Sequence, residues 1–308
     1  MFRLLLIFTF LYLPIAIAQQ PISSDLTSAE FIDYTRVISE IPRTSLLSLE
    51  KSFSRESIPS WIEIIGSTAI LYHNDEVILH DIQQSGREWG IGNEDRTKAV
   101  LSAGDIDILR LPSDTGSVLY FLGDGWLHGG IAAGFLYNGF SAHHSRAFNT
   151  GLQLTHGMIV STLFNQFLKR SFGRESPYVK TEKLGRWSPY PSIPEYQSHT
   201  SRYDAMPSGH VMTTTLVFTI INENYPEYSH LIVPIGVTWT SLLAWQMVNN
   251  GVHWASDYPL GIAMGFVIGK EATRLGKQKQ KQDLKQSNWM IMPNSNQNGD
   301  GLTFLYTY

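Results

Sequence analysis

The chain contains no cysteine among its 308 residues. This absence excludes disulfide frameworks, thiolate nucleophiles, and zinc or iron–sulfur sites held by cysteine. Charged residues are also scarce at 16%, below the ~25% that is usual for soluble domains. The 23 basic and 27 acidic residues give a net charge of −4, so no global positive field attracts nucleic acid. A local cluster of positive groups must therefore meet any anionic ligand.

The remaining composition is that of a folded protein with a large core. The length allows one large domain or two small ones, and hydrophobic residues make up 43% of the chain. This content excludes a disordered chain. The mean hydropathy of −0.10 argues against an ordinary polytopic membrane protein. The low charge leaves contact with a membrane surface open.

The N-terminus has the pattern of an export signal. Arg3 is followed by an apolar run from Leu4 to Ile15, and Ala16-Ile17-Ala18 has the small-x-small form of a signal peptidase site. A buried N-terminal helix is the alternative, but the apolar run is short. We therefore predict a signal peptide over residues 1–18 and an exported, periplasmic mature chain beginning at Gln19.

The central region, residues 116–270, is predicted to be a helical bundle. Its long segments lack Lys, Arg, Asp and Glu but carry scattered Asn, Gln, Thr, Ser and His. Helices that are apolar on most sides lie either in a protein core or in lipid. The polar residues, together with Pro234 and Pro259, favour a buried bundle over membrane spans. The segments are Gly125–Ser145, Ala147–Leu168, Leu231–Ser256 and Tyr258–Gly269.

The regions on either side of this bundle are more polar. Residues 19–115 are predicted to be mostly helical, with helices around Ser28–Glu40 and Ile58–Leu71, and to pack on the bundle. Residues 271–308 are predicted to be a polar tail. It ends in a small β-hairpin, because two apolar or alternating runs flank Asn-Ser-Asn-Gln-Asn-Gly-Asp-Gly.

Three short clusters carry candidate chemistry. LKRSFGRESP (168–177) places Lys169 and Arg174 where an apolar helix ends. MPSGH (206–210) places Ser208, Gly209 and His210 at the start of another helix, where free backbone N–H groups and the helix dipole favour a phosphate.

The third cluster, NNGVHWASDYPLG (249–261), has His253 and Asp257 at helical i, i+4 spacing, so the carboxylate can hold one imidazole nitrogen. Taken singly, each cluster has an ordinary structural explanation. A His–Asp pair is often structural, Pro-Ser-Gly caps helices, and basic residues at a helix end are usually solvated. Their combination in this order is far more specific.

This order and spacing resembles the type 2 phosphatidic acid phosphatase and vanadium haloperoxidase superfamily, whose pattern is Lys-x6-Arg-Pro, Pro-Ser-Gly-His and Ser-Arg-x5-His-x3-Asp. The resemblance covers about residues 120–270 and implies an all-α helical bundle of the acid phosphatase and haloperoxidase type. It gives His253 the role of a nucleophile that becomes phosphohistidine, with Asp257 orienting it. His210 would protonate the leaving oxygen, and Lys169, Ser208 and Gly209 would bind phosphoryl oxygens.

Two arginines of the family pattern are missing. Ser176 stands before the proline of the first motif, and Gln246 and Met247 replace the Ser-Arg pair of the third. A lost charge donor in such a site can weaken transition-state stabilisation by ~2.7–4 kcal/mol. We expect Arg174 to bind the phosphate instead. The other candidates are Arg186 and Arg202 in the long loop 177–207, and the neutral donors Asn249 and Asn250.

Three functions remain open at this stage. The first is an exported, metal-independent phosphatase without a cofactor, acting on phosphorylated lipids or small phosphoesters. The second is a haloperoxidase with vanadate as its cofactor, and the third is a catalytically weakened binder of phosphorylated ligands. Four further histidines lack a metal-binding spacing and are interpreted as core or surface residues. These are His128, His143, His144 and His156. Four loop aromatics either form a wall for a lipid chain or pack on the bundle, namely Trp187, Tyr190, Tyr196 and Tyr203.

Overall fold

The computed structural model describes residues 38–306, apart from positions 95, 104–105, 287–288 and 297–298. It describes side chains for residues 38–94, 96–102 and 111–278. The predicted signal peptide and nearly all of the predicted helix Ser28–Glu40 lie outside these ranges.

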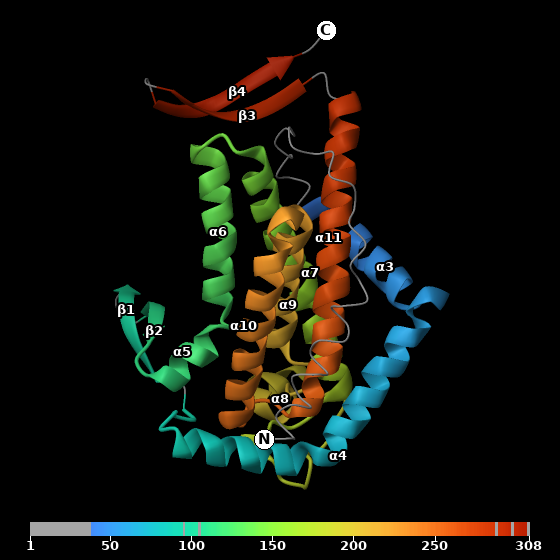
Figure 1. Cartoon of the computed structure of the whole chain (residues 1–308), viewed down its shortest axis with the longest axis vertical. Helices are drawn as coiled ribbons and strands as arrows, with labels where there is room; N and C mark the ends of the chain where they lie inside the picture. Colours follow the sequence, from blue (N-terminus) through green and yellow to red (C-terminus); the bar gives the residue numbers. More distant parts are fainter. Residues whose placement is uncertain (1–37, 95, 104–105, 287–288, 297–298, 307–308) are drawn as a thin grey trace.

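The protein is an all-α bundle, as predicted (Figure 1). Its central helices correspond to the uncharged segments: α6 (Gly125–Ser141), α7 (Ser145–Phe172), α10 (Ser229–Asn249) and α11 (Tyr258–Gln286), with α9 (Gly209–Asn224) between them. Helix α11 begins where the uncharged segment begins and continues through the basic stretch to Gln286. The shorter helices α5 (Thr115–Phe121) and α8 (Ile193–Ser198) lie in the connections.

Two helices precede the central bundle. Helix α3 (Ile41–Ser52) contacts α7 and α11, and the short 3-10 turn η1 (Arg55–Ser57) follows it. Helix α4 (Ile58–Glu88) begins where the sequence predicts but extends 17 residues beyond Leu71. It passes below the lower end of the bundle in Figure 1 and contacts α10, α11 and the turn η5 (Ala255–Asp257). The region before the bundle is therefore in direct contact with the His-x3-Asp motif.

Two antiparallel hairpins complete the described chain. Strands β3 (Trp289–Asn296) and β4 (Gly299–Tyr306) form the predicted C-terminal hairpin, with Trp289 opposite Tyr306. Strands β1 (Thr97–Ala103) and β2 (Ile106–Pro112) form a second hairpin, which the interpretation of residues 19–115 as mostly helical does not include. The alternating run IDILRLP after Gly104-Asp105 is the signal that this interpretation overlooked.

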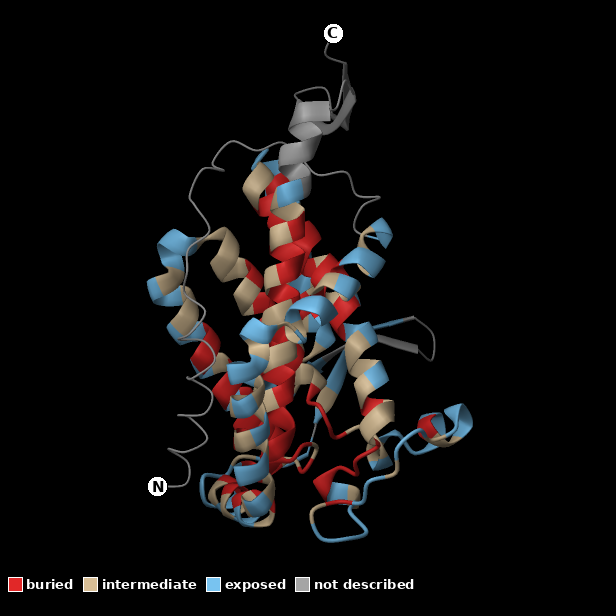
Figure 2. Cartoon of the chain, turned by 90° about the vertical axis from the view of Figure 1, so that its right-hand side faces the viewer, coloured by how far each residue is buried: buried red, intermediate tan, exposed pale blue. Residues whose placement is uncertain are grey.

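The core follows the axis of the bundle (Figure 2). One apolar cluster joins α4 and α10 to the segment around Trp254 and Tyr258. A second fills the space between α6, α7, α9 and α11, and includes Leu154, Leu216 and Ile268. The 3-10 turns η2 (Pro177–Val179), η3 (Thr200–Arg202) and η4 (Pro226–Tyr228) shape the loops that connect these helices.

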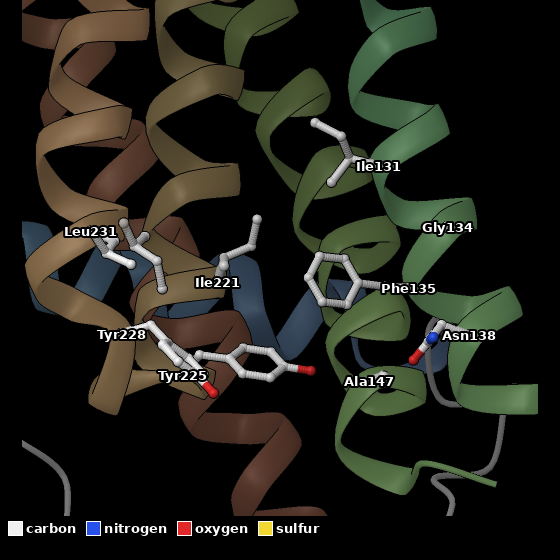
Figure 3. A pocket seen from close by; sticks show the side chains of 10 residues that line it. Ile131, Gly134, Phe135, Asn138, Ala147, Ile221, Tyr225, Tyr228 and Leu231 are labelled. Carbon is white, nitrogen blue, oxygen red and sulfur yellow. The ribbon is translucent and has the colours of Figure 1, made fainter. Parts of the chain in front are cut away.

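An apolar pocket of about 550 Å³ opens between α6, α7, α9 and the start of α10 (Figure 3). Phe135, Ile221 and Tyr225 are among the side chains that line it. Ala147 also lines it, near the start of α7, whereas Lys169 lies at the other end of the same helix. The pocket is therefore far from the clusters that carry the candidate chemistry.

Candidate functional site

The fold brings the three sequence clusters together at one end of the bundle. The last turn of α7 carries Lys169, the first turn of α9 carries His210, and η5 at the start of α11 carries Asp257. The rings of His210 and His253 lie 6.1 Å apart between centroids. The backbone N–H of Ser208 donates to the carbonyl oxygen of Asp257 at 3.1 Å, so the second and third clusters are joined directly.

His253 is held in one tautomer by its surroundings. Its ring is buried, 1% exposed, and Nδ1 lies 2.6 Å from the carbonyl oxygen of Ala205. A carbonyl oxygen only accepts, so Nδ1 carries the hydrogen of the neutral ring and Nε2 carries a lone pair. Within the described part of the chain, Nε2 has no hydrogen-bond partner. The arrangement therefore presents an unoccupied basic nitrogen in a buried site.

Asp257 lies beside this ring but makes its short hydrogen bonds elsewhere. Its Oδ2 accepts from the backbone N–H of Trp254 at 2.8 Å and lies 3.6 Å from His253 Nδ1. The sequence assigns the orienting role to Asp257, whereas the structure gives the closest contact of Nδ1 to the Ala205 carbonyl. Asp257 instead fixes the backbone next to His253 and places a negative charge near its ring.

His210 is the second residue of α9 and packs edge-on against Tyr120 at 5.4 Å between ring centroids. Burial holds the pKa of His210 well below its usual value of 6.5, and the neighbouring His253, Lys169 and His128 lower this pKa further. The ring is therefore neutral in the free protein near pH 7. A negatively charged ligand next to it would oppose these effects and favour its protonation.

The turn before His210 has the form of an anion-binding helix start. The hydroxyl oxygen of Ser208 accepts from the N–H of Val211 at 3.5 Å and so caps α9. The amides in the first turn of a helix have no acceptor within that helix, and the helix dipole makes this end positive. Gly209 lies so close to α7 that an added methyl group would overlap the amide nitrogen of Asn165.

Asn165 is a site residue that the sequence reasoning missed. It lies one helical turn before Lys169 on α7, and this i, i+4 spacing places both side chains on one face. Its Oδ1 is buried and has no partner in the described part of the chain. The spacing from Lys169 was the available signal.

Lys169 is buried and makes one ion pair, with its Nζ 3.3 Å from Asp204 Oδ2. Its charge contributes to the low pKa of His210, which places the ammonium group within electrostatic reach of the histidine pair. The structure therefore brings together Lys169, Ser208, Gly209, His210 and His253.

Arg174 is oriented away from a phosphate-binding role. Its Nη1 donates to Asp257 Oδ1 at 2.6 Å and to Ser256 Oγ at 2.7 Å. Its Nη2 donates to Asp75 Oδ2 at 2.8 Å and to the Leu184 carbonyl at 3.1 Å, which also accepts from Nε at 3.4 Å. These contacts use all five guanidinium N–H groups. The assignment of Arg174 to phosphate binding is therefore corrected, because its guanidinium pairs with two buried carboxylates and not with a phosphate.

Met247, at the position of the arginine missing from the third motif, is fully buried in the apolar cluster between α4 and α10. The other proposed substitutes for the missing arginines also have different surroundings. Asn249 donates to the Gly92 carbonyl at 3.1 Å, and Asn250 Oδ1 accepts from Gln246. Arg186 is exposed on the long loop. Arg202 is also exposed there.

Two of the remaining histidines and three of the loop aromatics make packing contacts, whereas His143, His144 and Tyr190 are exposed. His128 is buried against Thr214 Oγ1 at 3.2 Å, and burial lowers its pKa to about 4. His156 contacts Thr44 Oγ1 at 2.7 Å. Within the described residues, no group of three or more His, Asp or Glu side chains is placed to hold a metal ion. Trp187 packs on Phe172 and Tyr72, and Tyr196 stacks on Tyr203.

These features define a class of protein: an all-α bundle that joins a lysine at a helix end, a Pro-Ser-Gly-His helix start and a His-x3-Asp turn in one buried site. The sequence model of the PAP2 superfamily matches residues 150–281, which confirms the resemblance to the type 2 phosphatidic acid phosphatase superfamily over this segment. Phosphatase and haloperoxidase-type activities are those of the matched superfamily. Comparison with curated proteins and with solved structures gave no match.

Proposed function

We propose that the protein is an exported phosphatase that hydrolyses phosphomonoesters or diphosphates of lipids through a phosphohistidine at His253. The observation that carries this proposal is the Nε2 of His253, which has no hydrogen-bond partner among the described residues and whose lone pair is fixed by the hydrogen bond from Nδ1 to Ala205. A neutral imidazole is an effective nucleophile near pH 7 and requires no metal ion. The substrate phosphoryl group would lie between His253 and the start of α9.

In the first step, Nε2 of His253 forms a bond to phosphorus while the bond to the leaving oxygen breaks. His210 donates a proton to that oxygen, and the negative phosphoryl group supports the protonated ring that this requires. The charge that the His253 ring gains faces Asp257, whose Oδ2 is 3.6 Å from Nδ1. Lys169, the Nδ2 amide group of Asn165, the hydroxyl of Ser208 and the backbone N–H of Gly209 donate to the phosphoryl oxygens.

In the second step, His210 takes a proton from water as the water oxygen attacks phosphorus. The bond between phosphorus and Nε2 breaks, and its electron pair returns to His253. When phosphate leaves, His253 is neutral again, and His210 releases to solvent the proton that it took up from solvent when the phosphoryl group bound. One residue thus acts as acid and then as base, which its position beside the nucleophile allows.

Exposed apolar side chains at the same end of the bundle support a lipid substrate. Phe167, two residues before Lys169, is 63% exposed, and Tyr190 is 73% exposed. The N–H of Tyr190 donates to the Arg170 carbonyl at 2.7 Å, so it lies beside the last turn of α7. Within the part of the chain that the structure describes, the segment Pro226–Asn249 is apolar and long enough to cross a membrane, although 56% of its most apolar 18-residue window is buried in the bundle. These features fit contact with a membrane surface.

The structure disfavours the other two functions. Tight vanadate binding needs several charge donors, and Arg174 has none left for an oxyanion. A binder without catalysis has no use for an unpaired, buried nitrogen beside a second histidine, since an unsatisfied buried acceptor costs stability.

The test is hydrolysis by the purified protein of phosphatidate, a polyprenyl diphosphate and an aryl phosphate, followed by phosphate release. His253→Ala should abolish turnover and covalent capture of labelled phosphate. His210→Ala should reduce turnover of the aryl phosphate less than that of the lipid phosphates, because a good leaving group needs less acid assistance. His144→Ala, at an exposed position, is the control. Activity that a chelator removes and zinc or magnesium restores would contradict this mechanism.

A further inference from the structure

Asp75, on helix α4, reaches the catalytic turn from outside the segment that matches the superfamily. It is 1% exposed, and its Oδ1 accepts from the backbone N–H of Ser256 at 3.0 Å. Its Oδ2 accepts from Ser256 Oγ at 2.5 Å and from Arg174 Nη2 at 2.8 Å. One carboxylate therefore holds both the η5 turn and the guanidinium that pairs with Asp257.

The three charges form a buried chain, Asp75–Arg174–Asp257, which we call the charge triad. It lies among aromatic rings, with the guanidinium carbon of Arg174 5.0 Å from the ring centroids of Tyr72, Trp187 and Trp254. Two carboxylates face one guanidinium, so the triad carries excess negative charge in apolar surroundings. Removing such a group from water costs energy that its internal attraction often fails to offset, and apolar residues of similar volume are frequently as stable. Stability alone is therefore a weak explanation for the triad.

The contacts of Asp257 show what the triad positions. Its Oδ1 is bound to Arg174, which leaves Oδ2 directed at the N–H of Trp254 and the Nδ1 side of His253. The carbonyl of Asp257 accepts from the N–H of Ser208, the cap of α9. A shift of this aspartate would therefore move both histidine-bearing elements relative to each other.

We propose that Asp75 and Arg174 are positioning residues for the reaction at His253, with Asp75 acting through Arg174 and Ser256 on Asp257. This inference rests on the proposed function. It assigns to α4 a part in the catalytic apparatus, and it explains why Arg174 remains although it does not touch the phosphate. The quantity that the triad controls is the placement of Nε2 for attack, so the inference concerns kcat rather than substrate binding.

The first variant is Asp75→Asn, which keeps the shape of the side chain and removes its charge. An amide must direct its NH₂ group at one of the donors that the carboxylate accepts from, so either Arg174 or Ser256 loses a partner. We expect kcat to fall on the order of 10- to 100-fold with KM changed by less than about twofold, as for a misplaced reacting group. Acid-quench measurements should show slower phosphoenzyme formation.

A matched control separates positioning from general stability. Glu271 is a buried carboxylate on α11 that pairs with Arg274 away from η5, so Glu271→Gln removes an equivalent charge. Both variants are compared at equal folded fraction, established by thermal unfolding. If Asp75→Asn fails to fold, Ser256→Ala replaces it, because this change keeps all three charges and removes only the hydroxyl between Asp75 and Arg174.

Double-variant analysis gives a second readout. Asp75→Asn and Arg174→Lys act through the same route, so their combined effect on kcat should be clearly less than the product of the two separate effects. The inference is wrong if Asp75→Asn, or Ser256→Ala in its place, has the same kcat as Glu271→Gln. It is also wrong if the variant changes only KM. In both cases the proposed function stands. If the wild-type protein hydrolyses none of the phosphoesters, the proposed function fails and this inference fails with it.

Discussion

The two buried carboxylates beside Arg174, those of Asp75 and Asp257, determine the role of this arginine. Asp75 and Asp257 both lie in surroundings where an isolated charge is strongly unfavourable, so each needs a cation with well-placed donors. The planar guanidinium can satisfy two carboxylates, a hydroxyl and a carbonyl at once, which an ammonium group cannot. The absence of the family's other arginines therefore leaves the phosphate site with Lys169 and the α9 helix start as its main positive groups.

The first prediction concerns Asp75 and pH. Burial raises the pKa of Asp75 from 3.8 to about 6, with the Asp257 charge adding to this effect and Arg174 opposing it. A raised folded-state pKa means that the folded protein holds more protons than the unfolded chain between pH ~4 and ~6, so stability from this group falls as pH rises through that window. The total change is about 3 kcal/mol.

Asp75→Asn removes this titration. Urea unfolding at several pH values should show the wild-type free energy of unfolding declining relative to that of Asp75→Asn from pH ~4 to ~6, and a constant difference above. A difference that stays flat across the whole range would show that Asp75 does not titrate in this window.

At the scale of single residues, the sequence predicts those that form motifs but does not predict the residues that hold these motifs in place. His210, His253, Lys169 and Ser208 lie within recognisable spacings, and the structure brings them together. Asp75 is 99 residues from Arg174 and belongs to no pattern, because nothing local distinguishes it from the surface carboxylates of α4. The role of Arg174 is misassigned for the same reason. Its spacing from Lys169 in the sequence indicates that it lies near the site but does not show which carboxylates it pairs with.

Helices α9 and α11 approach each other through a row of glycines. Gly261, Gly265 and Gly269 lie one helical turn apart on α11, facing the carbonyl groups of Ser208, Met212 and Leu216 on α9. Their lack of a side chain lets the two backbones come into contact. This contact holds the helix that begins with the Pro-Ser-Gly-His motif against the helix that follows the His-x3-Asp motif.

The second prediction tests this contact. A methyl group on Gly265 would overlap the Met212 carbonyl oxygen, so Gly265→Ala should force the helices apart. We expect about 1–3 kcal/mol of destabilisation, as for an overpacked core, and a lower kcat because His210 and His253 move apart.

Gly130→Ala is the matched control, since this glycine lies in α6 with nothing within 4 Å of an added methyl group. It should stabilise the protein by about 0.4–1 kcal/mol by restricting the unfolded chain. Chemical denaturation of both variants checks the pair, and equal behaviour would refute the proposed close approach.

The elements themselves were largely predictable from their composition. Long segments without charge can satisfy their backbone only as helices in a core, and the four predicted segments match α6, α7, α10 and the start of α11. The length of α4 and the β1–β2 hairpin were not predicted. Helix α4 has an irregular apolar pattern because the polar Asp75 is buried on it while Ile62 and Ile65 are exposed, so its periodicity alone does not define its end.

The whole molecule has two distinct ends. Ala147, which lines the apolar pocket of Figure 3, and Lys169 lie 22 residues apart on α7, or about 33 Å along the helix axis. The side chains exposed at the histidine end, Phe167 and Tyr190, are therefore separate from this pocket. A lipid whose phosphate lies beside His253 would contact Phe167 and Tyr190 and not the pocket.

The third prediction follows from this separation. Phe167→Ala should lower kcat/KM for a long-chain phosphatidate by several-fold and leave that for a short, soluble phosphoester unchanged, because only the long chain uses this surface. Tyr228→Ala and Leu231→Ala, at the distant pocket, should leave both values within about twofold of wild type. Steady-state kinetics with both substrates check this, and a selective loss of long-chain activity in the pocket variants would place the lipid chain at the other end.

The contact between Asp75 and Ser256 spans 181 residues of the chain. During synthesis the N-terminal part of the chain emerges long before the turn that pairs with Asp75. Until that turn is made, we expect the hydration of this carboxylate to oppose collapse of α4 onto the apolar segments of the central bundle. The entropy cost of closing a loop grows only slowly with its length. The time at which Asp75 meets Ser256 therefore depends more on the order of synthesis than on the length of the loop between them. We therefore expect the docking of α4 to be completed late, together with the turn η5 that Asp75 contacts.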